Sequence, residues 1–364
     1  MTTYQRLGDY IREVNVRNRE LKVTNLLGLS IEKKFIPSIA NTIGTDMSSY
    51  KIVQPSQFAY VPVTSRNGDK ITVALYDGEE SAIISQAYTI FEIIDHKALL
   101  PEYLMMWFRH PEFDRYARFH SHGSAREVFD WDELCNVQLP VPSIVRQREI
   151  VAEYETLTRL IRLNEQMIAK LEETAQTLYR HTFVDNIDKQ NLPQGWRMRT
   201  IGEFCEIITG KKDVNESLNE GMYRFFSCSP DPYYSNEFIA QGPAVLIAGN
   251  GSYTGRVIYY DKEFDLYQRT YACLPKKGKA DLIPFLYCVL RFEFQLKYMG
   301  GSRGSSIPYI VKGDISEFEF AFNENECKSF SKEIEIIING IQSKIIENEK
   351  ITELQSLLLA RMGK

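Results

Sequence analysis

Residues 146–184 read RQREIVAEYETLTRLIRLNEQMIAKLEETAQTLYRHTFV, and apolar side chains recur in this stretch at alternating steps of four and three. This heptad spacing is typical of an α-helix that buries one stripe of side chains against another helix. A helix of about 35 residues is about 50 Å long, which is more than a compact core needs. We therefore predict a long paired helix with an interface formed by Ile150, Tyr154, Leu157, Ile161, Asn164, Ile168 and Leu171.

The C-terminal residues 324–364 repeat this pattern and predict a second long helix. Two such helices with a whole domain between them are expected to pair in antiparallel orientation, although each could instead pack only on its own globular domain. The seam asparagines Asn164 and Asn348 would fix the register of the pair, or would face solvent beside the seam. The second stripe consists of Ile334, Ile338, Ile341, Ile345 and Asn348 and, after the loss of one residue, Ile351, Leu354 and Leu358.

The segments before the two helices also repeat each other. Arg6–Tyr10 reads RLGDY and Thr200–Phe204 reads TIGEF, while the basic segment HGSAR at 122–126 corresponds to RGSS at 303–306. Strand-like apolar runs alternate with helical stretches, so we expect an α+β (mixed α/β) fold with two similar globular domains. The predicted segments are a first domain 1–145, a first helix 146–184, a linker 185–196, a second domain 197–323 and a second helix 324–364.

Composition excludes several classes of protein. Of 364 residues, 44% are hydrophobic and 12% aromatic, which is enough for real cores and excludes general disorder. No apolar run is long enough to span a membrane, and the N-terminus lacks a secretion signal. The six cysteines are scattered without Cys-x-x-Cys spacing, so we expect free thiols, a cytoplasmic location and no membrane partner.

The sequence contains only incomplete versions of catalytic, nucleotide-binding and metal-binding motifs. Gly249–Gly255 is rich in glycine, but it has the wrong spacing for a dinucleotide loop and leads into a strand-like run. His120 and His122 could be half of a metal site, yet the sequence shows no matching group of acids or thiols. We therefore expect no catalytic residues, no metal site and no cofactor on this chain.

Several segments resemble the specificity (S) subunit of type I restriction–modification systems. They are LPQGW at 192–196 with IGE at 201–203, LPVP at 139–142 with RQREIV at 146–151, SQAY at 85–88, and NGS at 250–252 with GRV at 255–257. The tandem domain–helix–domain–helix plan is also that of the family. In the second half, Phe320–Asn323 stands where the first half has LPVP, the Pro-rich segment before the long helix. This departure from the family pattern puts the start of the second helix in question.

The resemblance implies a non-catalytic subunit that recognises double-stranded DNA. Each globular domain would be a target-recognition domain that reads half of a bipartite site, and the helices would set the spacing and dock two modification (methyltransferase) subunits. S-adenosylmethionine would bind those partners, and ATP and Mg would bind a restriction subunit, if one is present. The alternatives are a coiled-coil DNA-binding architectural protein without a methyltransferase partner, or a cryptic nuclease.

The basic Gly-Ser segments are the candidate DNA contacts, although the chain has a net charge of −5. Glycine lets a backbone approach DNA closely, serine donates to phosphates, and arginine reaches phosphates or guanine edges. The alternatives are solvated basic faces, a polar turn at 66–70 and a structural role for Tyr253 and Arg256 at a strand end. The candidates are His122, Gly123, Ser124, Arg126, Arg303, Gly304, Ser305, Ser306, Lys276, Lys277, Lys279, Arg66, Lys70, Tyr253 and Arg256.

Overall fold

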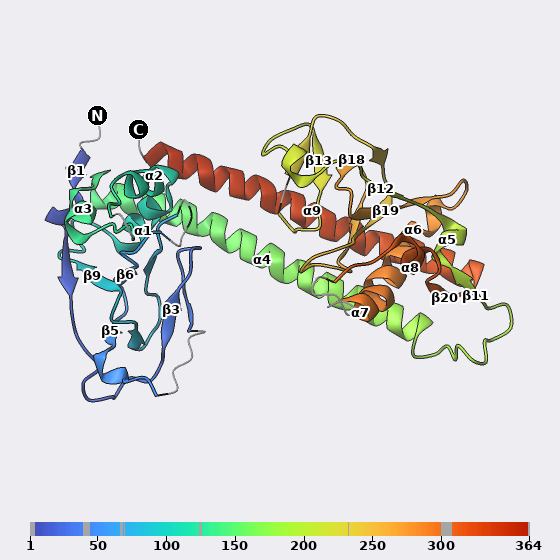
Figure 1. The fold of residues 1–364 in the computed structure, drawn as a ribbon, viewed down its shortest axis with the longest axis horizontal. Coiled ribbons are helices and arrows are strands. Elements are labelled where there is room, and N and C mark those ends of the chain that lie inside the picture. The colour runs from blue at the N-terminus through green and yellow to red at the C-terminus, as the bar shows by residue number, and fades with distance from the viewer. Residues whose placement is uncertain are drawn as a thin grey trace. The chain divides into compact units, whose positions relative to one another are not determined.

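The computed structural model describes residues 4–38, 44–65, 68, 70–123, 126–231, 233–299 and 308–362. The described residues form both helices and short strands, which confirms the predicted mixed α and β fold (Figure 1). The chain divides into two compact units, Met1–Arg162 with Asn348–Lys364, and Leu163–Glu347. This division differs from the predicted domains because each unit contains part of both long helices.

The two long helices are α4 (Ile144–Phe183) and α9 (Glu324–Met362). α4 begins two residues before its predicted start and ends one residue before its predicted end, whereas α9 begins at the predicted residue and ends two residues early. Asn323 caps α9, because its Oδ1 accepts hydrogen bonds from the backbone N–H groups of Asn325 at 3.1 Å and Glu326 at 3.2 Å. Asn323 thus caps the second helix at the place where the first half has the Pro-rich segment LPVP.

The first unit is built around a four-stranded sheet with the order β2-β9-β6-β7. Phe108 of α1 packs edge-on against Phe58 and Phe91 of this sheet, with ring centroids 5.8 and 6.1 Å apart. Two further pairs, β3-β4 and β5-β8, and the pair β1-β10 complete the unit. Its elements are β1 (Tyr4–Arg6), β2 (Ile11–Val14), β3 (Leu27–Leu29), β4 (Phe35–Pro37), β5 (Lys51–Val53), β6 (Phe58–Tyr60), β7 (Val73–Leu75), β8 (Ala82–Ile84), β9 (Thr89–Ile93), α1 (Pro101–Arg109), α2 (Pro111–Phe119), α3 (Trp131–Asn136) and β10 (Gln138–Pro140).

The second unit repeats this plan with the sheet β12-β19-β16-β17 and the pair β11-β20. It differs in a second four-stranded sheet, β14-β13-β18-β15. Its elements are β11 (Arg197–Thr200), α5 (Ile201–Phe204), β12 (Cys205–Thr209), β13 (Tyr223–Phe226), β14 (Tyr233–Ser235), β15 (Ala240–Gln241), β16 (Ala244–Ala248), β17 (Val257–Tyr260), β18 (Glu263–Leu266), β19 (Thr270–Pro275), α6 (Ile283–Val289), α7 (Gln295–Tyr298), α8 (Lys312–Ser316) and β20 (Glu319–Phe322).

The matching strand orders agree with the internal sequence repeat. In each unit, the strand that opens the repeat pairs with the strand that precedes the long helix: β1 with β10 and β11 with β20. Within the part of the chain that the structure describes, no helix is long and apolar enough to cross a membrane. All six cysteines are free thiols.

Within each unit, α4 and α9 run antiparallel. In the first unit, the Gln355 side chain donates to Thr158 Oγ1 at 2.7 Å, and Ile150 shares a core with Leu359. In the second unit, the rings of Phe183 and Phe330 lie 5.0 Å apart. Rising residue numbers on α4 therefore meet falling numbers on α9, as expected for two helices with a whole domain between them.

Burial of the predicted seam is uneven. The Asn164 side chain is 6% exposed and hydrogen-bonds Glu347 of α9, so it faces the partner helix and not solvent. Leu354, at 52% exposed, is not buried as predicted, because the stripe shifts after the lost residue. Ile345, which precedes that loss, is also exposed, at 39%. Buried members are Ile150, Ile334, Ile338, Ile341 and Ile351, and half-buried members are Tyr154, Leu157, Ile161, Ile168, Leu171, Asn348 and Leu358.

A buried glutamine fixes the start of α4 in the first unit. Gln147 is fully buried, and its Oε1 accepts from the backbone N–H of Leu100 at 2.9 Å. Its Nε2 donates to the carbonyl oxygens of Ala98 at 2.8 Å and Pro142 at 2.9 Å. One amide thereby satisfies three backbone groups that would otherwise be buried without partners.

We expect Gln147→Leu to lower the free energy of unfolding by about 1–3 kcal/mol, because the leucine leaves those backbone groups unpaired. Chemical denaturation of the full chain measures this change. Gln166→Leu, on an exposed position of the same helix, is the control and should change stability by less than about 0.5 kcal/mol. Equal effects of the two substitutions would contradict the anchoring role of Gln147.

Candidate nucleic-acid interface

In the first unit, the loop between β6 and β7 lies against the predicted basic segment. Val128 forms bridges to both Val63 and His122, and the backbone N–H of Thr64 donates to the carbonyl of Glu127 at 3.0 Å. The exposed Arg126 belongs to this junction. The sequence-predicted residues Arg66 and Ser124 lie outside the described residues.

Gly123 is required by the fold of this segment itself. Its φ is +139°, and a Cβ at this position would lie 2.1 Å from the carbonyl oxygen of Arg126. No other residue fits such a close approach without moving the backbone. Lys70, at the end of the neighbouring loop, is exposed and pairs with Glu32 at 3.2 Å.

In the second unit, the turn between β16 and β17 occupies the corresponding place. Asn250 forms a bridge to Tyr309, and the backbone N–H of Gly251 donates to the carbonyl of Pro308 at 3.2 Å. A Cβ on Gly255 would lie 3.3 Å from the backbone nitrogen of Met299. The residues on both sides of 300–307 thus contact this turn, whereas Arg303, Gly304, Ser305 and Ser306 themselves lie outside the described residues.

Tyr253 and Arg256 lie together on the β16–β17 turn. Tyr253 is 48% exposed, and the Arg256 guanidinium lies 5.8 Å from the centre of its ring. Arg256 also donates to the carbonyl of Ser229 at 2.8 Å, and burial lowers the pKa of Arg256. Arg256 therefore holds a neighbouring loop in place, while Tyr253 offers an exposed face beside a cavity of about 290 Å³.

The predicted lysines do not join this turn. β19 begins with Thr270 opposite Ala248 and ends with Pro275 opposite Cys205, so residues after β19 lie at the other end of the sheet. Lys276 donates to the carbonyl of Gly202 at 2.5 Å, and Lys279 lies 5.6 Å from the centre of the Phe204 ring. Lys277 is exposed at the same end. The structure thus separates Lys276, Lys277 and Lys279 from Tyr253 and Arg256, the other described candidates of this unit.

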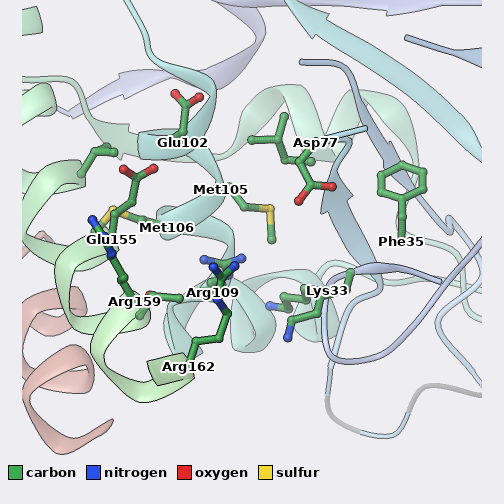
Figure 2. A pocket seen from close by; sticks show the side chains of 14 residues that line it. Lys33, Phe35, Asp77, Glu102, Met105, Met106, Arg109, Glu155, Arg159 and Arg162 are labelled. Carbon is green, nitrogen blue, oxygen red and sulfur yellow. The ribbon is translucent and has the colours of Figure 1, made fainter. Parts of the chain in front are cut away.

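A basic cavity in the first unit was not foreseen from the sequence. It has a volume of about 630 Å³ and lies between α1, β4, β7 and the N-terminal part of α4. Figure 2 shows Arg109, Arg162 and Lys33 extending into the same space. The charged residues that line it are Lys33, Lys34, Arg109, Arg159 and Arg162, with Asp77, Glu102 and Glu155.

The cationic side chains of this basic cavity differ in whether an acidic partner neutralises their charge. Lys33 is 6% exposed and pairs with Asp114 at 2.7 Å, and burial lowers the pKa of Lys33. Arg109 lies 5.7 Å from the centre of the Tyr154 ring. Among the described residues, Arg109, Arg159 and Arg162 have no ion-pair partner. The cavity is therefore suited to an anion.

The spacing of Arg159 and Arg162 on one helix face was the only sequence signal for this cavity. Lys33 and Arg109 come from distant segments and meet them only through the fold.

The structure also corrects the expectation that His120 and His122 lack a matching acid. Glu133 of α3 lies beside them, with its Oε2 3.1 Å from His120 Nδ1.

Comparison with known proteins shows which family the chain resembles. Residues 193–355 match the model of the type I restriction modification DNA specificity domain. The predicted resemblance to type I specificity subunits is thus confirmed.

Two curated relatives are specificity subunits of type I restriction enzymes. The chain is 34% identical over 164 residues to the type I restriction enzyme EcoDI specificity subunit of Escherichia coli, covering 45% of this chain and 36% of that protein. It is 19% identical over 299 residues to the MjaIX specificity subunit of Methanocaldococcus jannaschii, covering 71% of this chain and 66% of that protein. The matched region thus spans about a third of the first relative and just under two thirds of the second.

One solved structure shares the fold. The type I restriction–modification S subunit from M. genitalium aligns over 100% of this chain and 96% of its own, with a TM-score of 0.59 and 14% sequence identity. This likeness supports the mixed fold with long helices.

Proposed function

We propose that this chain is a DNA-recognition subunit in which each globular unit reads one half of a bipartite duplex site. The matched placement of two loops carries the proposal. In both units, the loop after the third strand of the shared sheet contacts a basic Gly-Ser segment or its flanks. A duplicated reader needs such equivalent surfaces, because half-site spacing on DNA mirrors the geometry of the protein.

The chemistry of these loops suits DNA. Arg126 and Arg303 can reach phosphates or guanine edges, and serine hydroxyls can donate to phosphates. The basic cavity supplies further positive charge in the first unit, through Arg109, Arg159 and Arg162. The acidic net charge does not oppose this, because only the surface facing DNA needs to be positive.

The helices would set the distance between half-sites and dock two modification (methyltransferase) subunits. In the first unit, α4 and α9 line an apolar groove of about 570 Å³ in which Leu354 and Leu357 are each 52% exposed. Such apolar side chains at a helix pair suit a protein partner. Methyl transfer from S-adenosylmethionine would occur on those subunits, and ATP and Mg would bind restriction subunits where these are present.

Co-purification tests the proposal against its alternatives. We expect the chain to form a complex with a modification subunit and to support DNA methylation only in that complex. Stable DNA binding without any methyltransferase partner would favour an architectural protein. Metal-dependent cleavage by the purified chain alone would favour a nuclease.

We expect Arg126→Ala to weaken binding of the cognate duplex. A contact to a base would cost about 1–3 kcal/mol and relax specificity at one position, whereas a contact to a phosphate would weaken all sequences equally. Binding of single-base variants of the site, measured by titration, distinguishes the two. Arg148→Ala, at an exposed position near the start of α4, is the control and should leave affinity unchanged. Unaltered binding by the Arg126 variant would remove this residue from the interface.

We expect the double substitution Arg159→Glu with Arg162→Glu to weaken binding of all duplexes and to flatten its salt dependence. Each lost phosphate contact lowers the slope of log K against log salt by about 0.9. Arg148→Glu with Lys350→Glu changes the net charge equally, at exposed positions of α4 and α9 that do not line the cavity, and serves as the control. The same loss in both doubles would show that only total charge matters.

A further inference from the structure

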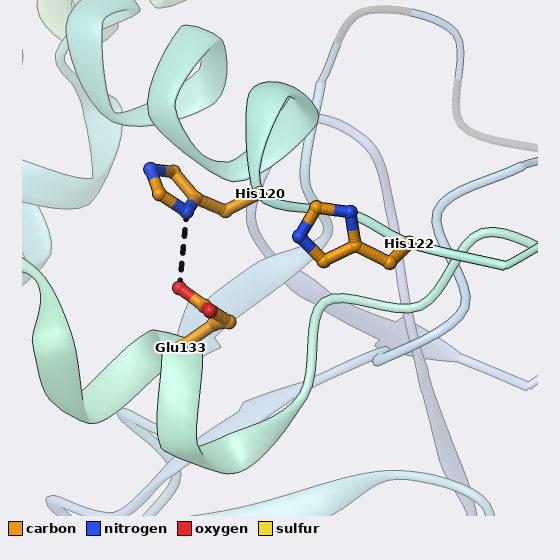
Figure 3. A group of neighbouring side chains, drawn as sticks. All are labelled: His120, His122 and Glu133. Carbon is orange, nitrogen blue, oxygen red and sulfur yellow. Dashed lines mark ion pairs between the residues drawn. The ribbon is translucent and has the colours of Figure 1, made fainter.

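Two histidines and a glutamate meet at the end of α2. One potential ligand atom from each of His120, His122 and Glu133 lies within 4.8 Å of the others. Figure 3 shows both imidazole rings and the carboxylate directed toward a common space. All three belong to the first unit, and Glu133 supplies the acid that no sequence pattern pairs with the histidines.

Each of these three residues lies on a different segment, and backbone hydrogen bonds fix its position. The N–H of His120 donates to the carbonyl of Tyr116 at 3.0 Å as α2 ends, and the two rings stack with centroids 4.2 Å apart. His122 exchanges two backbone hydrogen bonds with Val128, at 3.1 and 2.9 Å. Glu133 lies in the first turn of α3, where its N–H donates to Asp130 at 2.9 Å. The convergence of the three side chains therefore follows from the local fold.

The ligand set selects a class of metal. Imidazole nitrogens with one carboxylate suit zinc and related transition metals, whereas calcium and magnesium prefer oxygen ligands. Zinc binds nitrogen and oxygen at about 2.0–2.2 Å, so two ligand atoms in a tetrahedral site lie about 3.3 Å apart. The His120–Glu133 separation of 3.1 Å already fits, and a ligand atom of the exposed His122 lies within 4.8 Å of both.

We propose that His120, His122 and Glu133 bind one zinc-type metal ion, with water in the fourth position. The ion would join the end of α2 and the start of α3 to His122, whose backbone pairs with Val128 close to Arg126. It would thereby restrict the conformations of the loop that we assign to DNA contact. The metal site itself stands independently of that assignment.

Metal titration of the full, untagged chain tests the site after removal of bound metals with a chelator. We expect one equivalent of Zn²⁺ to bind and to raise the unfolding temperature, and Co²⁺ to give visible d–d absorption at the same stoichiometry. His122→Ala and Glu133→Gln should each lower Zn²⁺ affinity at least tenfold. His96→Ala removes an exposed histidine of the same unit and should leave binding unchanged.

Two results would overturn the proposal. One is the absence of saturable Zn²⁺ binding by the wild-type chain, a measurement that does not depend on whether the variants fold. The other is Zn²⁺ affinity that stays the same in folded His122→Ala and Glu133→Gln variants. Circular dichroism shows whether each variant is folded. If a variant does not fold, Zn²⁺ affinity is measured with His122→Gln in its place.

Discussion

Exchanging residues 1–145 for the corresponding domain of a relative should change one half of the recognised sequence and leave the other half unaltered. Each mismatched base pair costs about 1–3 kcal/mol, so a half-site of about three base pairs is worth several kcal/mol. The hybrid should therefore bind the original site at least a hundredfold more weakly. This is the largest effect that we expect, because a whole reader is replaced.

The reciprocal exchange of residues 197–323 is the matched control. It should alter the opposite half-site and spare the one that the first exchange changed. Selection of bound duplexes by each hybrid measures both outcomes. A change in both half-sites after either exchange would mean that the two units do not read DNA separately.

Lengthening the two helices together should lengthen the gap between half-sites. Four residues inserted after Glu165 in α4 and four after Ile345 in α9 add about 6 Å of helix. Both positions are exposed, so the cores of the two units are left intact. Because a base pair rises about 3.4 Å, we expect the preferred gap to grow by one or two base pairs, and the original site to be bound at least tenfold more weakly.

Four residues also rotate a helix by slightly more than one turn, in the same sense as the twist of DNA. The control is a variant with four residues inserted between Asn186 and Ile187, in the segment that follows α4, which adds no helical length. Its preferred gap should stay constant. An unchanged gap in the double insertion would show that the helices do not set the distance.

The helices were the most predictable part of the fold. Their signal is local, since a heptad stripe from Ile150 to Leu171 specifies both a helix and a buried face. Apolar runs such as that of β16 carry a similarly local signal for a strand. The parallel pairing of β13 with β18 left no such signal, because it depends on contacts between distant segments.

The candidate interface was predictable only in part. The Gly-Ser segments were found because they repeat, and the structure places Arg126 and the flanks of Arg303 against equivalent loops. The lysines at 276–279 were grouped with them by charge alone, and the strand register puts them at the other end of the sheet. Lys33 and Arg109 were missed because only tertiary folding brings them to α4.

The metal ligands show the same limit. His120 and His122 were visible as a pair in the sequence, but the start of α3 had to be placed before Glu133 could be recognised as their neighbour. Gln147 was part of a family-like motif, yet its three backbone hydrogen bonds emerge only from the packed structure.

Selection of duplexes from a random pool tests most directly whether this chain contains two DNA readers. The chain would be used in complex with its modification subunit, and the bound sequences would be determined. We predict two blocks of specified bases separated by a gap of constant length and unspecified sequence. A single contiguous block, or no enrichment over the starting pool, would contradict the account.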